Sequence, residues 1–181
     1  NLANKKLTWD LSVYQFDLNE TIVVRRAADG SDYFANVGQT TQQGLEMSLT
    51  WNIHKNLSLI QNTAWQNFRF SDYTSAGKTY SGNFLTGTSP FQNTFMAIYV
   101  HPTGFSWTGQ YQFMDYMFLN DANTDILPAS RLLHSKISYS HHVAKLTFET
   151  WVAAENILNE TYSSGPDLNA AAGRYFNAAP G

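Results

Sequence analysis

Carboxylates are the side chains of this 181-residue sequence best suited to acid–base chemistry, and two of them, Asp115 and Asp121, lie close together. Glu46 and Glu149 stand further apart. No nucleophile motif accompanies any of them, because the sequence contains no GxSxG, P-loop, HExxH or GxGxxG pattern. We therefore expect no enzyme and no catalytic residue, and keep a hydrolase only as a minor alternative.

Histidines could bind a metal, but their spacing is unfavourable. His141 and His142 are predicted to lie in a tight turn, and adjacent residues of an extended chain point to opposite faces. His54 and His101 also border predicted turns, and His134 is isolated. The absence of cysteine excludes a disulfide framework and a thiolate metal site. We expect no metal site and no cofactor.

The composition indicates a non-aqueous neighbour. Charged residues make up 14% of the chain, whereas soluble domains average roughly 25%. Mean hydropathy is −0.32, and no run approaches the roughly 18 apolar residues of a membrane-spanning helix. Only helices and closed barrels satisfy the backbone inside lipid, so a barrel remains. The 11 Lys and Arg residues are scattered and the net charge is −3, which gives no reason to expect nucleic acid.

Apolar and polar residues alternate along much of the chain, as in strands with two unlike faces. In residues 45–53 every second residue is apolar, and segments 7–13, 105–113, 133–139 and 146–154 behave similarly, with Trp151 falling on the polar side as an exception. The pattern predicts an all-β fold, an antiparallel transmembrane β-barrel segment of about eight strands. The predicted strands are 7–16, 21–26, 33–53, 57–68, 91–101, 105–118, 131–140 and 144–156.

The connections between these strands differ in length. Tight turns are predicted at 17–20, 54–56, 102–104 and 141–143, and long polar loops at 69–90, 119–130 and 157–181. Short periplasmic turns and long extracellular loops are typical of outer-membrane barrels, whereas soluble sandwiches have short connections at both ends. Aromatic residues near predicted strand ends, such as Tyr14, Phe16 and Tyr99, fit interfacial girdles. A soluble lipocalin-like barrel of eight strands, with its apolar face inward, remains an alternative.

Several segments resemble, in the same order, the barrel of the TonB-dependent outer-membrane receptors of the ferric-siderophore type. The segments are 33–40 with 44–46, 58–70 with 72–73, 120–125 with 127–128, 155–162, and 173–177 with 179–181. The resemblance covers nearly the whole chain. It implies that residues 1–181 are the C-terminal portion of such a barrel, without the plug domain and the final strand.

The resemblance implies TonB-dependent uptake of a scarce nutrient, most often a ferric siderophore, across the bacterial outer membrane. The implied partners are the chelate, outer-membrane lipid, and TonB through the missing N-terminal region. Ligand contacts are then expected from aromatic and Arg side chains of the loops, which suit a bulky and often anionic chelate. The candidates are Tyr73, Tyr80, Phe84, Tyr116, Phe118, Tyr162, Arg174, Tyr175 and Phe176.

Overall fold

The structure is a computed structural model, and it describes residues 6–27, 29, 31–36, 38–75, 77–163, 165–170 and 173–176. The regular elements in these ranges are β-strands, which confirms the predicted all-β class. They are β1 (Leu7–Asn19), β2 (Ile22–Arg26), β3 (Asp32–Asn36), β4 (Gln39–His54), β5 (Leu57–Asp72), β6 (Thr74–Ser75), β7 (Lys78–Thr79), β8 (Phe91–Val100), β9 (Phe105–Met114), β10 (Met117–Phe118), β11 (Ile126–Leu127), β12 (Ser130–Val143) and β13 (Leu146–Ala154).

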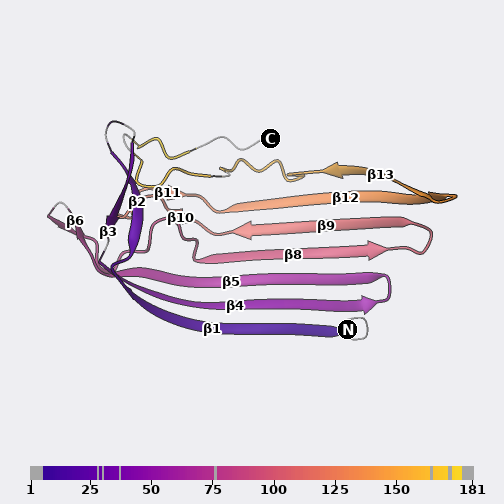
Figure 1. Cartoon of the computed structure of the whole chain (residues 1–181), viewed down its shortest axis with the longest axis horizontal. Helices are drawn as coiled ribbons and strands as arrows, with labels where there is room; N and C mark the ends of the chain where they lie inside the picture. The colour runs from indigo at the N-terminus through magenta and orange to yellow at the C-terminus, as the bar shows by residue number, and fades with distance from the viewer. Residues whose placement is uncertain are drawn as a thin grey trace.

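Seven strands form one antiparallel sheet in the order β1-β4-β5-β8-β9-β12-β13. They lie side by side in chain order, with tight turns at one end and long connections at the other (Figure 1). The sheet is open, with β1 and β13 at its two edges. The other strands form two-stranded sheets within the long connections, namely β2–β3, β6–β7 and β10–β11.

The start of the chain departs from the predicted strand pattern. Residues 17–19 do not form a tight turn but continue β1, where Asn19 pairs with Gln39 of β4. The predicted barrel strand 21–26 instead pairs with β3 in a separate hairpin, and the predicted strand 33–53 is divided between β3 and β4. Tyr14 and Phe16 therefore approach the long-loop end rather than a tight turn. The reason is that a local hairpin alternates as well as a spanning strand does.

The β2–β3 hairpin is closed by a short polar turn. Asp29 accepts hydrogen bonds from the Ser31 hydroxyl at 2.6 Å and the Ser31 backbone N–H at 2.9 Å. These hydrogen bonds, that of the hydroxyl first, lower the pKa of the Asp29 carboxyl, because they favour its charged form. The turn is thereby fixed by an ionised side chain at neutral pH.

Elsewhere the predicted alternation of turn lengths is correct. Residues 55–56, 101–104 and 144–145 connect strands tightly, whereas 73–90 and 115–129 form long connections. The long connection between β1 and β4 was not predicted. Some bounds differ: β5 continues to Asp72, and β9 ends at Met114 before the separate β10. His141 and His142 are not in a turn but in β12, opposite Phe148 and Thr147 of β13.

The sheet has one apolar and one polar face, which its register defines. One row of paired residues is Trp9, Leu49, Gln61, Phe95, Tyr111 and Leu133. The next row, on the opposite face, is Asp10, Ser48, Asn62, Thr94, Gln112 and Leu132. On the apolar face Trp51 is 45% exposed and Val152 is 74% exposed. The apolar face is therefore the outer one, as in a membrane barrel, and the described strands do not form the inward-facing apolar core of a lipocalin-like barrel.

The tight turns are stepped along the sheet. Leu57, Tyr99, Trp107, Ile137 and Val152 share one row of paired residues. Leu57 is the first residue of β5, but β12 continues from Ile137 to Val143 before it turns. In Figure 1 the β12–β13 hairpin accordingly extends beyond the other turns. Strands that tilt by roughly 35–45° in a barrel require such a stagger, which brings the turns toward a common level.

Gly104 in the β8–β9 turn is expected to tolerate alanine poorly. Its φ is +95°, and an added Cβ would overlap the backbone carbonyl of Ser140 in β12, whose N–H donates a 2.9 Å hydrogen bond to the Gly104 carbonyl. We expect Gly104→Ala to lower the free energy of unfolding of the full-length protein by about 2–4 kcal/mol, the sum of backbone strain and overpacking. Urea unfolding in lipid vesicles measures this change.

Gly77→Ala is the matched control. Gly77 has φ +74° but open space around its Cβ position, so only the backbone strain applies and we expect a loss of about 1 kcal/mol. Equal losses at the two glycines would contradict the close approach of β12 to the turn.

Candidate functional site: a polar hollow beneath three interlocked loops

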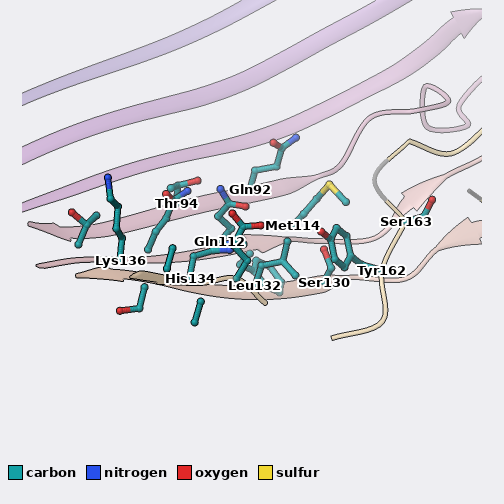
Figure 2. Close-up of a pocket in the computed structure, with 17 residues that line it drawn as sticks. Gln92, Thr94, Gln112, Met114, Ser130, Leu132, His134, Lys136, Tyr162 and Ser163 are labelled. Carbon is teal, nitrogen blue, oxygen red and sulfur yellow. The ribbon is translucent and has the colours of Figure 1, made fainter. Parts of the chain in front are cut away.

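The polar face of the sheet carries a hollow of about 840 Å³. Its floor is formed by β8, β9, β12 and the end of β13, and Tyr162 and Ser163 border it from the third long segment (Figure 2). The polar lining consists mainly of uncharged amides and hydroxyls. These include Gln92, Thr94, Thr108, Gln110, Gln112 and Ser130. Such a surface can form hydrogen bonds with a hydrated ligand or with another protein segment, whatever the sign of its charge.

Two charged residues line the hollow, Lys136 on β12 and Glu155 just after β13. Lys136 forms a 3.7 Å ion pair with Glu149, and its ammonium lies 5.2 Å from the ring centre of Trp151. Both side chains of the ion pair are about half exposed, so screening by water makes its contribution to stability small. Trp151 lies in the inward row with Ser106 and Ser138, as the sequence exception predicted.

A second hollow of about 300 Å³ continues along the same face toward β1. Asp10 and Glu46 line it together with Ser12, Ser48 and Asn62. The two hollows share Gln92 and Thr94, so the polar surface is continuous across the sheet.

Asp121 connects three long segments above the sheet. It is 4% exposed. Its carboxylate accepts hydrogen bonds from the Thr86 hydroxyl at 2.6 Å, the Asn169 amide at 3.1 Å and the Tyr73 hydroxyl at 3.2 Å. Its backbone carbonyl accepts a further one from the Asn83 amide at 2.8 Å. Because these donors come from residues 73–90 and 165–170, one carboxylate holds the three segments together.

Two small apolar clusters accompany this network. In the first, Phe70 and Tyr73 are buried, with ring centres 4.9 Å apart, and Tyr80 and Leu85 pack against them. In the second, Leu119, Leu127 and Tyr175 are buried, with Met114, Met117 and Ala170 against them. The long connections are therefore packed structures with cores of their own.

Neighbouring amides reinforce the same junction. The Asn123 side chain donates to the Phe84 carbonyl at 3.0 Å and accepts from the Phe84 N–H at 2.7 Å. Asn123 has a φ of +55°, a left-handed conformation that asparagine adopts more readily than most residues. The sequence favoured polar loops here but did not show that their polar side chains would bind one another.

The structure places the nine predicted ligand contacts in four settings. Tyr73 and Tyr175 are buried, 4% and 9% exposed, in the two clusters, and Tyr80 packs beside Tyr73. Phe84, Tyr116 and Phe118 form one aromatic group, with Phe84 stacked on Phe118 at 5.6 Å and Tyr116 edge-on to Phe118 at 5.5 Å. Tyr162 borders the large hollow. Arg174 and Phe176 are exposed.

The sequence analysis did not include other residues that are candidate ligand contacts. The Arg69 guanidinium lies 3.8 Å from the ring centre of Phe84 and donates to the Gly82 carbonyl at 2.7 Å. Gln110, Gln112 and His134 line the hollow. The alternation along 105–113 and 133–139 was the signal for these residues, since it put them on the polar face.

The described part of the chain has neither a cluster of metal-binding side chains nor a helix that could span a membrane. No group of three or more Asp, Glu or His side chains there could hold a metal ion. Nor does any helix in the described ranges have the length and apolar character to cross a membrane.

The sheet with its outward apolar face, tight turns at one rim and polar concave face defines a section of a membrane β-barrel. Residues 1–157 match the family model described as TonB dependent receptor-like, beta-barrel. The chain therefore belongs to the TonB-dependent receptor family and forms part of its barrel.

Solved structures share this fold. The ferric preacinetobactin receptor BauA of Acinetobacter baumannii superposes with a TM-score of 0.76 at 17% identity, over 97% of this chain and 26% of BauA. The unliganded ferric citrate transporter FecA gives 0.77 at 15% identity, over 98% of this chain and 28% of FecA. The copper transporter OprC gives 0.66 at 15% identity, over 88% and 24%. The chain thus spans about a quarter of the length of the structures it matches.

Proposed function

We propose that the protein containing this chain is an outer-membrane receptor that imports a ferric chelate, of the siderophore or citrate kind. The observation that carries the proposal is the polar hollow of the barrel face beneath three interlocked loops, in a chain of the TonB-dependent receptor family. BauA and FecA, whose barrels resemble this one, are described as a receptor and a transporter of ferric chelates. OprC, described as a copper transporter, has the same fold, so the fold leaves the cargo open.

The partners of the proposed receptor are the ferric chelate, outer-membrane lipid around the apolar face, and TonB. TonB would act through an N-terminal region that lies outside this chain. No covalent step is needed, because import requires only binding and displacement. In this role the barrel section supplies a rigid wall and the loops supply contacts.

Iron uptake in a deletion strain tests the proposal directly. The full-length gene restored to that strain is expected to restore uptake of at least one radiolabelled ferric chelate under iron limitation, among citrate, catecholate and hydroxamate chelates. The same gene with TonB function removed is expected to restore none. Uptake of every chelate at the level of the deletion strain would contradict the iron proposal.

Within this proposal we place the ligand contacts on the predicted aromatic and Arg residues that remain accessible. Tyr162 is the strongest candidate, because it borders the hollow. The others are Phe84, Tyr116, Phe118, Arg174 and Phe176. Tyr73, Tyr80 and Tyr175 would contribute by holding the loops, since they pack in the clusters.

Tyr162→Ala in the full-length receptor is expected to weaken binding of the transported chelate about 5- to 30-fold, the loss typical of one aromatic contact. Ligand-dependent quenching of intrinsic fluorescence measures the affinity. Tyr139→Ala is the matched control, because Tyr139 lies on the outer face and is about half exposed. Unchanged affinity in Tyr162→Ala would remove this residue from the ligand site.

A further inference from the structure

The rim formed by the tight turns is basic. Lys55 lies in the β4–β5 turn and Lys145 in the β12–β13 turn, and Lys6 directly precedes β1; all three are exposed. The tight turns and the strand residues next to them, 54–56, 101–104 and 141–146, include no Asp or Glu. They do include four of the five histidines of the sequence. These are His54, His101, His141 and His142.

The acidic residues lie elsewhere. Of the 14 Asp and Glu residues, three lie on the inward face of the strands: Asp10, Glu46 and Glu149. The remaining eleven lie in or beside the long connections. They are Asp17, Glu20, Asp29, Asp32, Asp72, Asp115, Asp121, Asp125, Glu155, Glu160 and Asp167. The acidic residues are therefore concentrated in and beside the long connections, where Arg25, Arg26, Arg69, Lys78, Arg131 and Arg174 also lie. The lysines of the tight-turn rim, in contrast, have no acidic neighbours in the described turns.

Aromatic rings lie next to this rim on the outer face. Tyr99 lies 6.4 Å from Phe105 and 6.2 Å from His101, between ring centres. Tyr139 and His141 are stacked at 6.4 Å with an interplanar angle of 17°. Amphipathic rings at a strand end mark the level of lipid head groups in membrane barrels. The lysines of the adjoining turns are then placed at or just beyond the head-group phosphates.

We propose that this tight-turn rim binds anionic phospholipid, and that Lys55 and Lys145 contact the phosphodiester of its head group. The inference rests on the proposed function, because it requires the barrel to lie in a membrane. Charge complementarity favours an anionic lipid over a zwitterionic one: a lysine near a membrane surface raises the affinity for anionic lipid about fivefold. The stagger of the turns supports this proposal, because the tilt of strands in a barrel would bring Lys55 and Lys145 to a similar depth in the membrane.

Lipid selectivity of the full-length receptor tests this proposal. The receptor is reconstituted in bilayers of phosphatidylcholine with a minor fraction of spin-labelled phosphatidylglycerol, and the fraction of label immobilised at the protein is measured. The double variant Lys55→Gln/Lys145→Gln is expected to lower the preference for phosphatidylglycerol over phosphatidylcholine about 25-fold, which is fivefold for each lysine. Raising the salt concentration is expected to lower it in the wild type and to change it little in the variant.

The matched control is Lys78→Gln/Lys136→Gln. It removes the same charge, but Lys78 lies in β7 of a long connection and Lys136 faces the hollow beside Glu149. Equal preference in the two double variants would overturn the proposal, and so would effective competition by free glycerol phosphate, which carries the phosphate without the membrane. Co-flotation with vesicles checks insertion separately. Insertion without lipid preference overturns only this inference, whereas failure of the wild type to insert overturns the membrane proposal as well.

Discussion

Replacing Asp121 with alanine is expected to release the three long segments from one another while the barrel sheet persists. The substitution removes the acceptor of the Tyr73 and Thr86 hydroxyls and of the Asn169 amide, and it leaves these buried or part-buried donors without that partner. Each orphaned donor costs about 1–3 kcal/mol. Partial rehydration offsets some of the loss, so we expect the free energy of local opening to fall by about 2–4 kcal/mol.

Hydrogen exchange of the full-length receptor measures this opening. Amides of residues 73–90, 115–129 and 165–170 should exchange about 30- to 1000-fold faster in Asp121→Ala, in proportion to the lost free energy. Amides in β4, β5 and β9 should keep their protection. Asp121→Asn should give an intermediate value, because it keeps the volume and one acceptor oxygen but replaces the other oxygen with an NH2 donor that faces the donors of neighbouring side chains.

Asp72→Ala is the control for this prediction. Asp72 is an exposed carboxylate at the end of β5, close in sequence to the same loop. We expect it to change exchange by less than about threefold, as is usual for surface positions. Equal protection of the loops in Asp121→Ala and the wild type would show that the apolar clusters hold the loops without the carboxylate.

Leu49→Arg is expected to destabilise the membrane-inserted receptor by about 2–4 kcal/mol, whereas Ser48→Arg should cost less than about 1 kcal/mol. Leu49 lies on the outer face, in the row of Trp9, Phe95 and Leu133 between the two ends of the strands. A guanidinium there would enter hydrocarbon. Ser48 is its chain neighbour and lines the second hollow, where water solvates the same group.

Unfolding by urea in phospholipid vesicles gives both free energies under one condition. The pair is informative because the two positions are adjacent in β4 and differ only in the face of the sheet that they occupy. A larger loss for Ser48→Arg than for Leu49→Arg would reverse the assignment of faces. The proposed ligand site at the hollow of the polar face would then fail with it.

The hydrogen bonds of Asp121 couple the three long segments of the proposed receptor to one another. Tyr73 and Tyr175 are buried in the two apolar clusters and Asp121 is buried between the loops, so these two tyrosines hold the loops together. A ligand that displaced one loop would disturb the other two through Asp121. Loops that move as one unit would respond to a bound chelate together.

The sequence by itself determined the class of fold and the division of the sheet into one apolar and one polar face. Alternation in 45–53 and 146–154 requires one apolar face, and Leu49 and Val152 do lie on the outer one. The short connections at 55–56 and 101–104 and the long ones after Asp72 and Met114 were also evident, because glycine, proline, asparagine and serine cluster in them. These properties are local, so residues near one another in the chain suffice to predict them.

Tertiary structure alone decided which segments pair and which loops bind. The alternating segments 22–26 and 33–36 look like barrel strands, yet β1 pairs with β4 and excludes them, because the long partner strand offers thirteen paired residues from Leu7 to Asn19. In the sequence, nothing distinguishes Asp121 from the other carboxylates of the loops. Its role depends on Tyr73 and Asn169, each 48 positions away, which only the folded loops bring within hydrogen-bonding distance.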